Sequence, residues 1–326
     1  MTNLYDIIGD VHGHADALVA LLKRMGYEKQ RDGVWSHPER KAIFVGDFVD
    51  LGPKQVETVM LVKRMVESDS ALAVLGNHDL NAIAWFLPDP ASDGDYLRSH
   101  FSEKWGKKNR CQHAAFLAEV EEKPELHREI IDWFLTLPLW LDLPEIRVVH
   151  ACWHSRFIEY LTPVLLPGAR LSKALMPDAT REPAGEKNSL APSPLFTAVE
   201  ALTKGIEIPL PAGSSFNDKY GIARTRVRVR WWNEQATTYQ TAALLDDTLR
   251  ASVSNESLPE SSRVFEATDK PVFIGHYWQT GTPSPLTDKV ACVDYSVGHG
   301  GPLCAYRWEG ETTLDAKHFV WAEDAT

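Results

Sequence analysis

The chain has 326 residues, of which 44% are hydrophobic and 24% are charged, a composition typical of a globular protein. Its formal net charge of −11 argues against broad binding to nucleic-acid backbones or anionic membranes, which a basic surface normally provides. The four cysteines include no Cys-x-x-Cys pair, which argues against a zinc ribbon and a disulfide framework. No signal-peptide pattern and no apolar run of about 18 residues is present, so we expect a cytoplasmic protein.

The first quarter of the chain alternates between predicted strands and predicted helices. Short apolar runs predict strands over 4–8, 41–45 and 71–75. Apolar residues recur at helical spacing over 15–25 and over about 53–68, which predicts an amphipathic helix in each range. In α/β sheets of this kind, ligands bind just outside the carboxyl ends of the strands. The pattern therefore predicts an α/β fold with its functional site at that edge.

Two insertions are expected in the middle of the chain. Residues of about 81–137 are predicted to form a helical insertion that ends before Pro138. Residues of about 160–220 contain eight prolines and are expected to form an irregular insertion.

Further strands are predicted between and after these insertions. Apolar runs predict strands over 139–142, 146–149 and 271–274. The runs 290–295 and 303–308 are expected to pair as a terminal hairpin.

Five predicted strand ends carry side chains that can bind divalent metals. These are Asp10 with His12, Asp47 with Asp50, Asn77 with His78, His150, and His276. Two divalent ions about 3.5–4 Å apart share a bridging carboxylate and stabilise both the attacking and the leaving oxygen of an in-line displacement. Asp47, in the middle of the set, is the expected bridge. Two such ions carry more positive charge than Asp10 and Asp47 neutralise, which suits a phosphate dianion.

Five blocks of sequence contain these residues, and their order is informative. The blocks are Gly-Asp-Val-His-Gly at 9–13, Gly-Asp-Phe-Val-Asp-Leu-Gly-Pro at 46–53, Gly-Asn-His-Asp at 76–79, His-Ala at 150–151 and Gly-His at 275–276. Together they resemble the calcineurin-like metallophosphoesterases, and within them the phosphoprotein-phosphatase-type branch, which includes bacterial diadenosine tetraphosphatases and serine/threonine phosphatases. The resemblance implies a β-sandwich flanked by helices, a dimetal site at strand C-terminal ends, and a single metallophosphoesterase domain over 1–326.

The resemblance also implies a role for each site residue. The implied metal ligands are Asp10, His12, Asp47, Asn77, His150 and His276. Asp10 and His12 would bind the first metal, Asp47 would bridge, and the other three would complete the second. His78 would be the general acid, because Asp50 beside it would orient its ring and raise its basicity. The nucleophile would be a hydroxide bridging the two metals, for which Mn²⁺ is expected, with Fe, Zn or Ni as alternatives.

Two positions depart from the family pattern. Leu51 stands where the phosphatases usually place an arginine that binds the substrate's phosphate. Trp278 stands where the nuclease-like branch tends to carry a further histidine ligand. The first departure leaves the substrate class open, and the second argues against a nuclease of that kind.

A run of alternating arginines offers a replacement for the missing one. The run contains Arg224, Arg226, Arg228 and Arg230. At strand spacing they would share one face, with Val227, Val229 and Trp231 opposite. We hypothesise that Arg226, Arg228 or Arg230 binds the substrate's phosphate. The alternative is a solvated strand face that balances nearby acidic residues.

These observations predict a metal-dependent phosphatase, with three alternatives. The first is an asymmetric dinucleoside tetraphosphate hydrolase, in which the two insertions would form the nucleotide pocket. The second is a regulatory protein that binds metal without turnover, which the presence of His78 and Asp50 disfavours. The third is a nucleic-acid end-processing phosphatase, which only the stretch 228–232 supports. The expected substrate is a phosphorylated small molecule, a nucleotide or a phosphoprotein; nucleic acid and membranes are not expected partners.

Overall fold

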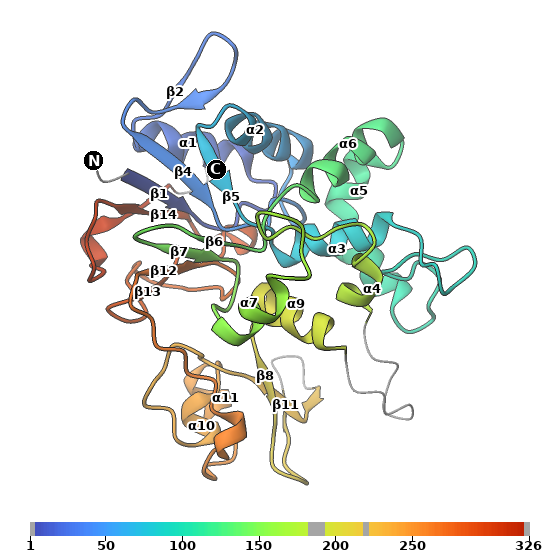
Figure 1. The fold of residues 1–326 in the computed structure, drawn as a ribbon, viewed down its shortest axis with the longest axis vertical. Helices are drawn as coiled ribbons and strands as arrows, with labels where there is room; N and C mark the ends of the chain where they lie inside the picture. Colours follow the sequence, from blue (N-terminus) through green and yellow to red (C-terminus); the bar gives the residue numbers. More distant parts are fainter. Residues whose placement is uncertain (1–3, 182–192, 218–221, 323–326) are drawn as a thin grey trace.

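The computed structural model describes residues 4–181, 193–217 and 222–322, and two β-sheets form its centre (Figure 1). The larger sheet contains, in order, β15 (Phe319–Ala322), β14 (Leu303–Trp308), β1 (Leu4–Ile8), β4 (Arg40–Phe44) and β5 (Ala71–Ala73). The smaller sheet contains, in order, β13 (Val290–Cys292), β12 (Val272–Ile274), β7 (Arg147–Val149) and β6 (Trp140–Asp142). Apolar side chains from both sheets, among them Ile7, Ile43, Val148 and Phe273, are fully buried in one cluster. The predicted β-sandwich is confirmed.

The strand register brings the polar segments together. β1 pairs in parallel with β4, and β4 with β5, so that Ile8 lies opposite Phe44 and Phe44 opposite Ala73. In the smaller sheet β12 pairs in parallel with both β7 and β13. Parallel strands end at the same edge of a sheet, so the segments that follow β1, β4, β5, β7 and β12 meet at one edge of the sandwich.

Helices cover both outer faces of the sandwich (Figure 1). α1 (Ala15–Arg24) and α2 (Gln55–Glu67) pack against the larger sheet, and a short hairpin of β2 (Glu28–Lys29) and β3 (Trp35–Ser36) follows α1. The apolar faces of both helices are buried, as their spacing predicted. Pro53 lies ahead of α2 rather than in its first turn, because the helix begins after Lys54.

The expected helical insertion contains helices, but the first of them begins before it, and residues 87–105 between the first two are not helical. α3 (Asn77–Phe86), α4 (Gly106–Gln112), α5 (Ala114–Val120) and α6 (Pro124–Phe134) lie side by side in Figure 1. α3 begins within the Gly-Asn-His-Asp block, so Asn77 and His78 occupy the first turn of a helix.

The range 160–220 was expected to be irregular, and this is wrong for much of its described part. It contains α8 (Met176–Thr180), α9 (Pro194–Lys204), β8 (Glu207–Pro209) and the end of α7 (Ser155–Leu161). Pro194 occupies the first turn of α9, where its missing N–H costs nothing, and the Ser193 hydroxyl accepts a hydrogen bond from the Phe196 N–H. Pro177 likewise lies in the first turn of α8, so these two prolines begin helices instead of breaking them. Pro183 and Pro192 lie outside the described residues.

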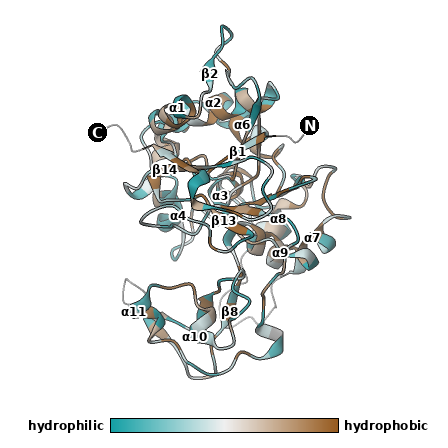
Figure 2. Ribbon diagram, turned by 90° about the vertical axis from the view of Figure 1, so that its left-hand side faces the viewer, coloured by the Kyte–Doolittle hydropathy of each residue, from teal (hydrophilic) through white to brown (hydrophobic). Residues whose placement is uncertain are grey.

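A small lobe of residues 206–264 lies beside the sandwich, at the bottom of Figures 1 and 2. It contains β8, β9 (Phe216–Asn217), β10 (Ala223–Arg224), β11 (Arg226–Arg228), α10 (Tyr239–Ala242), α11 (Asp247–Arg250) and η1 (Glu260–Ser262). A hydrophobic cluster of its own, with Val227, Val229 and Tyr239 among its buried members, stabilises the lobe. β11 pairs antiparallel with β8.

The terminal hairpin was predicted between the wrong strands. β13 pairs with β12 in the smaller sheet, whereas β14 lies between β1 and β15 in the larger one. The connection, which includes η2 (Val297–His299), therefore crosses from one sheet to the other. β14 pairs with β15, which follows η3 (Ala316–His318). Both β13 and β14 are almost wholly buried, so neither carries an alternation of apolar and polar residues that would identify its partner.

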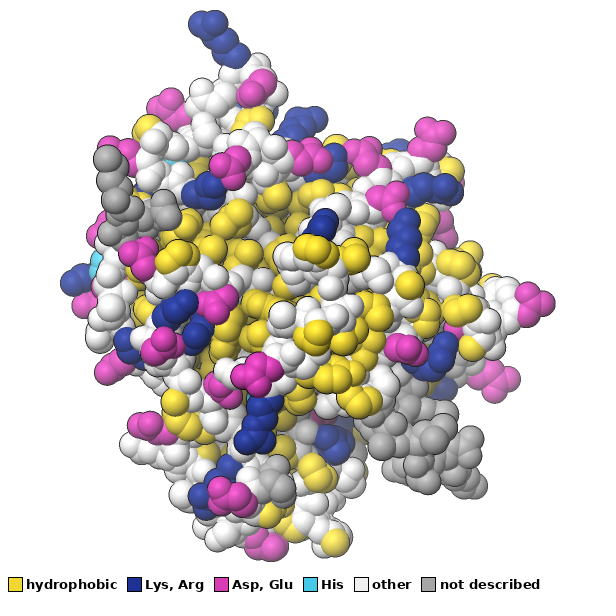
Figure 3. All heavy atoms as spheres, viewed as in Figure 1, with side chains coloured by type: hydrophobic (Ala, Val, Ile, Leu, Met, Phe, Trp, Pro, Cys, Tyr) yellow, Lys and Arg dark blue, Asp and Glu magenta, His cyan; other side chains and the backbone are white. Residues whose placement is uncertain are grey.

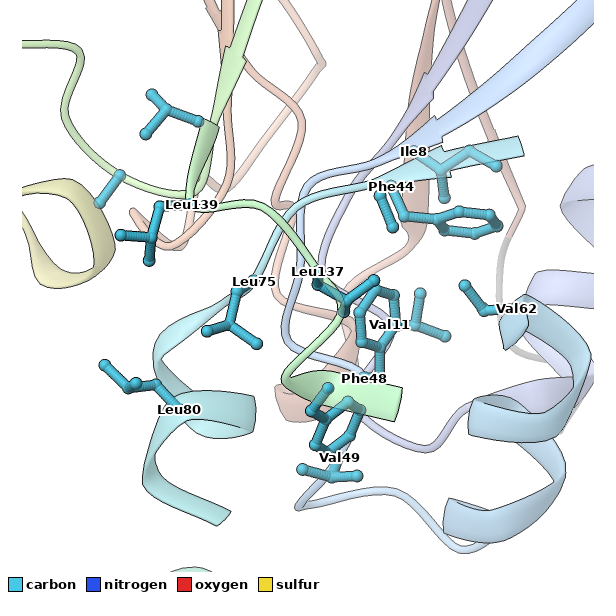
Figure 4. Close-up of a cluster of buried hydrophobic side chains, with 14 of the residues drawn as sticks. Ile8, Val11, Phe44, Phe48, Val49, Val62, Leu75, Leu80, Leu137 and Leu139 are labelled. Atoms are coloured by element: carbon cyan, nitrogen blue, oxygen red, sulfur yellow. The ribbon is translucent and has the colours of Figure 1, made fainter. Parts of the chain in front are cut away.

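The loops that carry the polar residues are anchored in the hydrophobic core. Figure 4 shows Val11, Phe48 and Val49, which belong to the loops after β1 and β4, beside Leu75 and Leu137. All five are buried in one cluster. Burial of such side chains contributes about 1.5–3 kcal/mol each, which holds the loops in place.

The outer surface is mixed in character. On the face shown in Figure 3, hydrophobic side chains gather in the middle, and basic and acidic side chains are interspersed around them. Within the described residues, no helix has the length and apolar character needed to cross a bilayer.

Candidate metal centre

Strained backbone is concentrated at the strand ends. Non-glycine residues with a left-handed φ include His12 (47°), Asp47 (57°), Asp50 (72°), Leu51 (70°), His276 (67°) and Trp278 (35°). Such conformations cost about 1–3 kcal/mol each and persist only where the surrounding structure imposes them. The strain indicates a functional site, and it falls on the residues that the sequence singled out.

Asp47 lies at the centre of the predicted ligands. Its carboxylate belongs to two groups whose donor atoms lie within 4.8 Å of one another, one with His12 and His78 and the other with Asp10 and His150. The distance from its Oδ2 is 3.3 Å to His150 Nε2 and 3.8 Å to His12 Nε2. A carboxylate shared by two donor groups is the arrangement that a pair of bridged cations requires.

Three further donor atoms converge beside Asp47. Asn77 Oδ1 lies 3.0 Å from His150 Nε2 and 2.8 Å from His276 Nδ1. His150 Nδ1 lies 2.7 Å from the Val45 carbonyl oxygen and donates to it. In the neutral ring Nε2 then carries a lone pair, which would face the lone pairs of the amide oxygen. Either a proton on His150 or a cation between these atoms removes the repulsion.

His12 is oriented in the same way as His150. Its Nδ1 lies 2.9 Å from the Val49 carbonyl oxygen, which directs Nε2 toward Asp47. Histidines that bind metals usually donate their second ring N–H to such an acceptor, which fixes the tautomer and the orientation of the ring.

Asp10 and His276 each retain an unsatisfied buried atom. Asp10 Oδ2 accepts a hydrogen bond of 3.0 Å from the His276 backbone N–H. Neither Asp10 Oδ1 nor His276 Nε2 has a hydrogen-bond partner among the described residues, although both are buried. Buried polar atoms are rarely left without a partner, so Asp10 Oδ1 is consistent with a ligand of a cation, whereas His276 faces Asn77 through its other nitrogen, Nδ1.

The buried carboxylates of the site favour the binding of a cation. Burial, followed by the nearby Asp294 carboxylate, raises the pKa of Asp10 well above its usual value. Burial alone would also raise the pKa of Asp47, but His150 and His78 hold it below the usual range. Burial would lower the pKa of His150, but Asp47 and Asp10 raise it to about 10. A divalent cation would replace the proton that these carboxylates attract.

Two glycines allow the backbone to approach the carboxylates. A Cβ atom at Gly76 would lie 2.1 Å from Asp47 Oδ1, and one at Gly275 would lie 2.0 Å from Asp10 Oδ1. Side chains at either position would displace the carboxylate. Steric conflict with these carboxylates therefore explains why glycine occupies the first position of the Gly-Asn-His-Asp and Gly-His blocks.

His78 and Asp50 form the expected pair. His78 Nδ1 lies 2.6 Å from Asp50 Oδ2, and the His78 backbone N–H donates to Asp47 Oδ1 at 2.8 Å. Burial would lower the pKa of His78, but Asp47 and Asp50 raise it above its usual value. A histidine held in this way is protonated near neutral pH and can donate a proton.

The structure adds two residues in contact with the site that the sequence did not single out. Asp79 accepts hydrogen bonds from the backbone N–H groups of Asp47, Phe48 and Gly76. Asp79 occupies the third position of α3, where an acidic residue caps a helix. This position in the sequence could have identified Asp79 as a capping residue. His113 binds Asp50 from the junction of α4 and α5, and no local sequence pattern marks it.

The arginine run alternates as predicted, but its members differ in their surroundings. Arg226 donates to the Glu207 carbonyl oxygen at 2.6 Å, and Arg230 donates to the Thr241 carbonyl oxygen. Arg228 reaches Glu207 Oε1 at 3.4 Å, and its charge is the second cause, after burial, of the lowered pKa of His276. Arg228 is thus the arginine of the run whose charge acts on a predicted ligand.

Leu51, which stands where the family's phosphatases usually place an arginine, belongs to an exposed rim that also contains two aromatic rings. Leu51 and Trp278 are 45% and 48% exposed. A Cβ atom at Gly298 would lie 2.4 Å from Leu51 Cδ1 and 3.5 Å from His12 Cδ2. The next residue, His299, packs edge-on against Trp278 with ring centroids 4.7 Å apart. We call Leu51, Trp278 and His299 the aromatic rim.

Comparison with known proteins identifies a family and relatives of the chain. The family profile described as calcineurin-like phosphoesterase matches residues 5–169. An asymmetrical bis(5'-nucleosyl)-tetraphosphatase of Halalkalibacterium halodurans is 33% identical over 146 residues, which are 44% of this chain and 54% of that protein. A symmetrical bis(5'-nucleosyl)-tetraphosphatase of Vibrio parahaemolyticus is 33% identical over 145 residues, 44% of this chain and 43% of that protein.

The matches to the relatives cover part of their length, and a solved structure matches the whole chain at low sequence identity. The chain spans about half the length of the curated relatives it matches. A solved structure described as a putative diadenosine tetraphosphatase covers 100% of this chain and 96% of its own, at 16% identity and a TM-score of 0.44.

Proposed function

Because the chain belongs to the calcineurin-like phosphoesterase family, we propose that it hydrolyses phosphate esters with two divalent cations held around Asp47. The observation that carries the proposal is the convergence of histidine, carboxylate and amide donors on Asp47 next to the His78–Asp50 pair. The proposed ligands are Asp10, His12, Asp47, Asn77, His150 and His276. When bound, the two cations offset the charge of the phosphate and lower the pKa of the attacking water.

The side chains of this chain perform the remaining steps. The attacking water releases one proton to solvent, and its oxygen forms a bond to phosphorus while the bond between phosphorus and the leaving oxygen breaks. The electron pair of the broken bond stays on the leaving oxygen. His78 donates a proton to that oxygen, and Asp50 holds the ring for the transfer. His78 regains its own proton from solvent after the reaction. Arg228 is the proposed aid to phosphate binding, because its charge reaches His276.

The donor set favours borderline first-row cations. Imidazole suits Zn, Fe and Ni, whereas carboxylate and amide oxygen suit Mn²⁺. We propose Mn²⁺ as the cation of first choice because oxygen donors from Asp10, Asp47 and Asn77 accompany the three histidines. We also propose a cytoplasmic location, since Cys152, Cys292 and Cys304 are buried, unpaired thiols.

The proposal is tested by assaying purified protein with Mn²⁺ on an aryl phosphate, a phosphodiester, a phosphopeptide and diadenosine tetraphosphate. His78→Ala should retain two metals and lose at least about a hundredfold in kcat, the usual contribution of a general acid. Asp47→Asn should lose metal. His318→Ala, in η3 outside the site, is the control and should keep its rate.

Two results would contradict the proposal. The first is a wild-type protein that binds metal but turns over no substrate, which would favour a regulatory role. The second is a His78→Ala variant that keeps its full rate.

A dinucleoside tetraphosphate is the second candidate substrate, and the aromatic rim favours it. The rim lies beside His12 and presents an exposed tryptophan. Stacking of a base on such a ring contributes about 1–3 kcal/mol. The relatives named above are tetraphosphatases of this kind.

The rim can be tested by substrate comparison. Trp278→Ala should raise KM for diadenosine tetraphosphate about tenfold and leave KM for phosphoserine unchanged, whereas Trp278→Tyr should retain most of the affinity. An equal change in KM for both substrates would exclude stacking.

A further inference from the structure

Asp50 holds two histidines. His78 Nδ1 lies 2.6 Å from its Oδ2, and His113 Nδ1 lies 3.0 Å from Oδ2 and 3.1 Å from Oδ1. The Asp50 carboxylate is fully buried, and so is the His113 ring. His78 is the proposed proton donor, whereas His113 takes no part in the proposed reaction steps.

His113 comes from a distant part of the chain. It is the junction residue between α4 and α5, 63 residues beyond Asp50. Its ring packs near Trp85, with centroids 6.0 Å apart. Its Nε2 is buried and has no hydrogen-bond partner among the described residues. The only polar contact that the described structure records for this ring is therefore the one to Asp50.

The direction of the hydrogen bond follows from the surroundings of the ring. Burial lowers the pKa of His113, so the ring is neutral at pH 7. The Asp50 carboxylate can only accept, which places the single ring proton of His113 on Nδ1. His113 thus donates to Asp50 as a fixed neutral donor.

A neighbouring residue contacts the same pair. Gln112 Nε2 lies 3.3 Å from His78 Nδ1, and Gln112 Oε1 accepts a hydrogen bond from Arg98. The last residue of α4 and the residue after it therefore contact both members of the His78–Asp50 pair.

We propose that His113 is a positioning residue that fixes the Asp50 carboxylate, and through it the proton-donating ring of His78. This inference rests on the proposed function. Asp50 could otherwise rotate about χ2, because its two oxygens are equivalent. The donor from His113 lies within hydrogen-bond distance of both oxygens, which restricts this rotation and keeps Oδ2 beside His78 Nδ1.

If His113 positions His78, its loss should affect the rate in a way that depends on the leaving group, which the loss of a purely structural residue would not. Proton donation matters when the leaving oxygen is strongly basic and matters little when it is weakly basic. A defect in positioning His78 should therefore slow phenyl phosphate much more than 2,4-dinitrophenyl phosphate. Each variant is compared with the wild type on the same substrate, so any contact of that substrate with the aromatic rim cancels.

The experiment compares kcat for these two substrates in three variants of the Mn²⁺-loaded full chain. His113→Phe keeps the ring and removes the donor, and His113→Asn keeps an N–H donor at the position of Nδ1. His127→Ala is the matched control, because His127 is a buried histidine of α6 that packs on Phe86 and Phe116.

His113→Phe should lose about tenfold in kcat on phenyl phosphate and less than about twofold on 2,4-dinitrophenyl phosphate, with KM unchanged. His113→Asn should recover most of the loss. His127→Ala should change both rates by the same factor. An equal loss on both substrates in His113→Phe, or no loss on either, would overturn the proposal. If His113→Phe does not fold, a full phenyl phosphate rate in His113→Leu, whose apolar side chain offers no donor to Asp50, would overturn it.

His78→Ala separates this inference from the proposed function. A leaving-group effect in His78→Ala without one in His113→Phe would remove only the role of His113. Absence of the effect in His78→Ala would remove the general-acid role itself.

Discussion

Asp79→Ala should destabilise the protein strongly although Asp79 is not a proposed ligand. Its carboxylate accepts hydrogen bonds of 2.9 Å from Asp47 N, 2.9 Å from Phe48 N and 3.0 Å from Gly76 N. Asp79 is fully buried, so alanine would leave three buried N–H groups without an acceptor. Each such group costs about 1–3 kcal/mol, and water that enters the vacated space would recover part of this. We expect a loss of about 4 kcal/mol.

Urea unfolding of EDTA-treated protein, followed by tryptophan fluorescence, measures this loss. At about 2 cal/mol/K per residue for the entropy of unfolding, 4 kcal/mol corresponds to a fall in Tm of about 6 °C for a chain of this length. Asp79→Asn keeps one acceptor oxygen and should lose about half as much. The control is Asp93→Ala, because Asp93 is exposed and its φ is not in the left-handed region, so the change in stability should be less than about 0.5 kcal/mol. A loss below about 1 kcal/mol for Asp79→Ala would refute the reasoning.

Two further predictions concern His127 and Gly275. Burial lowers the pKa of His127 to about 4, below the unfolded value of about 6.5, so its contribution to stability is present above pH 6.5 and is lost as the pH falls toward 4. Between pH 7.5 and 5 the loss of unfolding free energy due to His127 amounts to about 2 kcal/mol. Urea unfolding of His127→Leu should therefore show a decrease in stability over this pH range that is smaller by about 2 kcal/mol than in the wild type. The same decrease in both proteins would contradict this prediction. Gly275→Ala places a Cβ 2.0 Å from Asp10 Oδ1 and should weaken Mn²⁺ binding by at least about tenfold in calorimetry. Unchanged affinity would show that Asp10 is not a ligand.

The sandwich and the ligand cluster could be predicted because they depend on local signals. A buried run that ends in Gly-Asp or Gly-Asn marks the carboxyl end of a strand, and parallel pairing then brings these ends together. The alternation of Arg226 and Arg228 with buried Val227 likewise identified a strand from its period of two. These features require no knowledge of distant contacts.

Features that depend on distant contacts could not be predicted. The partner of β14 is β15 rather than β13, and fully buried runs carry no period that distinguishes the two. His113 reaches Asp50 only because α4 and α5 pack beside α2 and α3, where Glu119 of α5 also accepts the first backbone N–H groups of α2. Prolines indicated irregular structure near α9, where Pro194 instead begins a helix.

Metal stoichiometry coupled to turnover tests the central claim most directly. Metal-free protein is titrated with Mn²⁺ in a calorimeter while the hydrolysis of an aryl phosphate is followed in parallel. The convergence of donors on Asp47 predicts two equivalents bound and a rate that reaches its plateau at the second equivalent, with both lost in Asp47→Asn. A plateau at one equivalent, or binding that Asp47→Asn leaves intact, would contradict a dimetal phosphoesterase site.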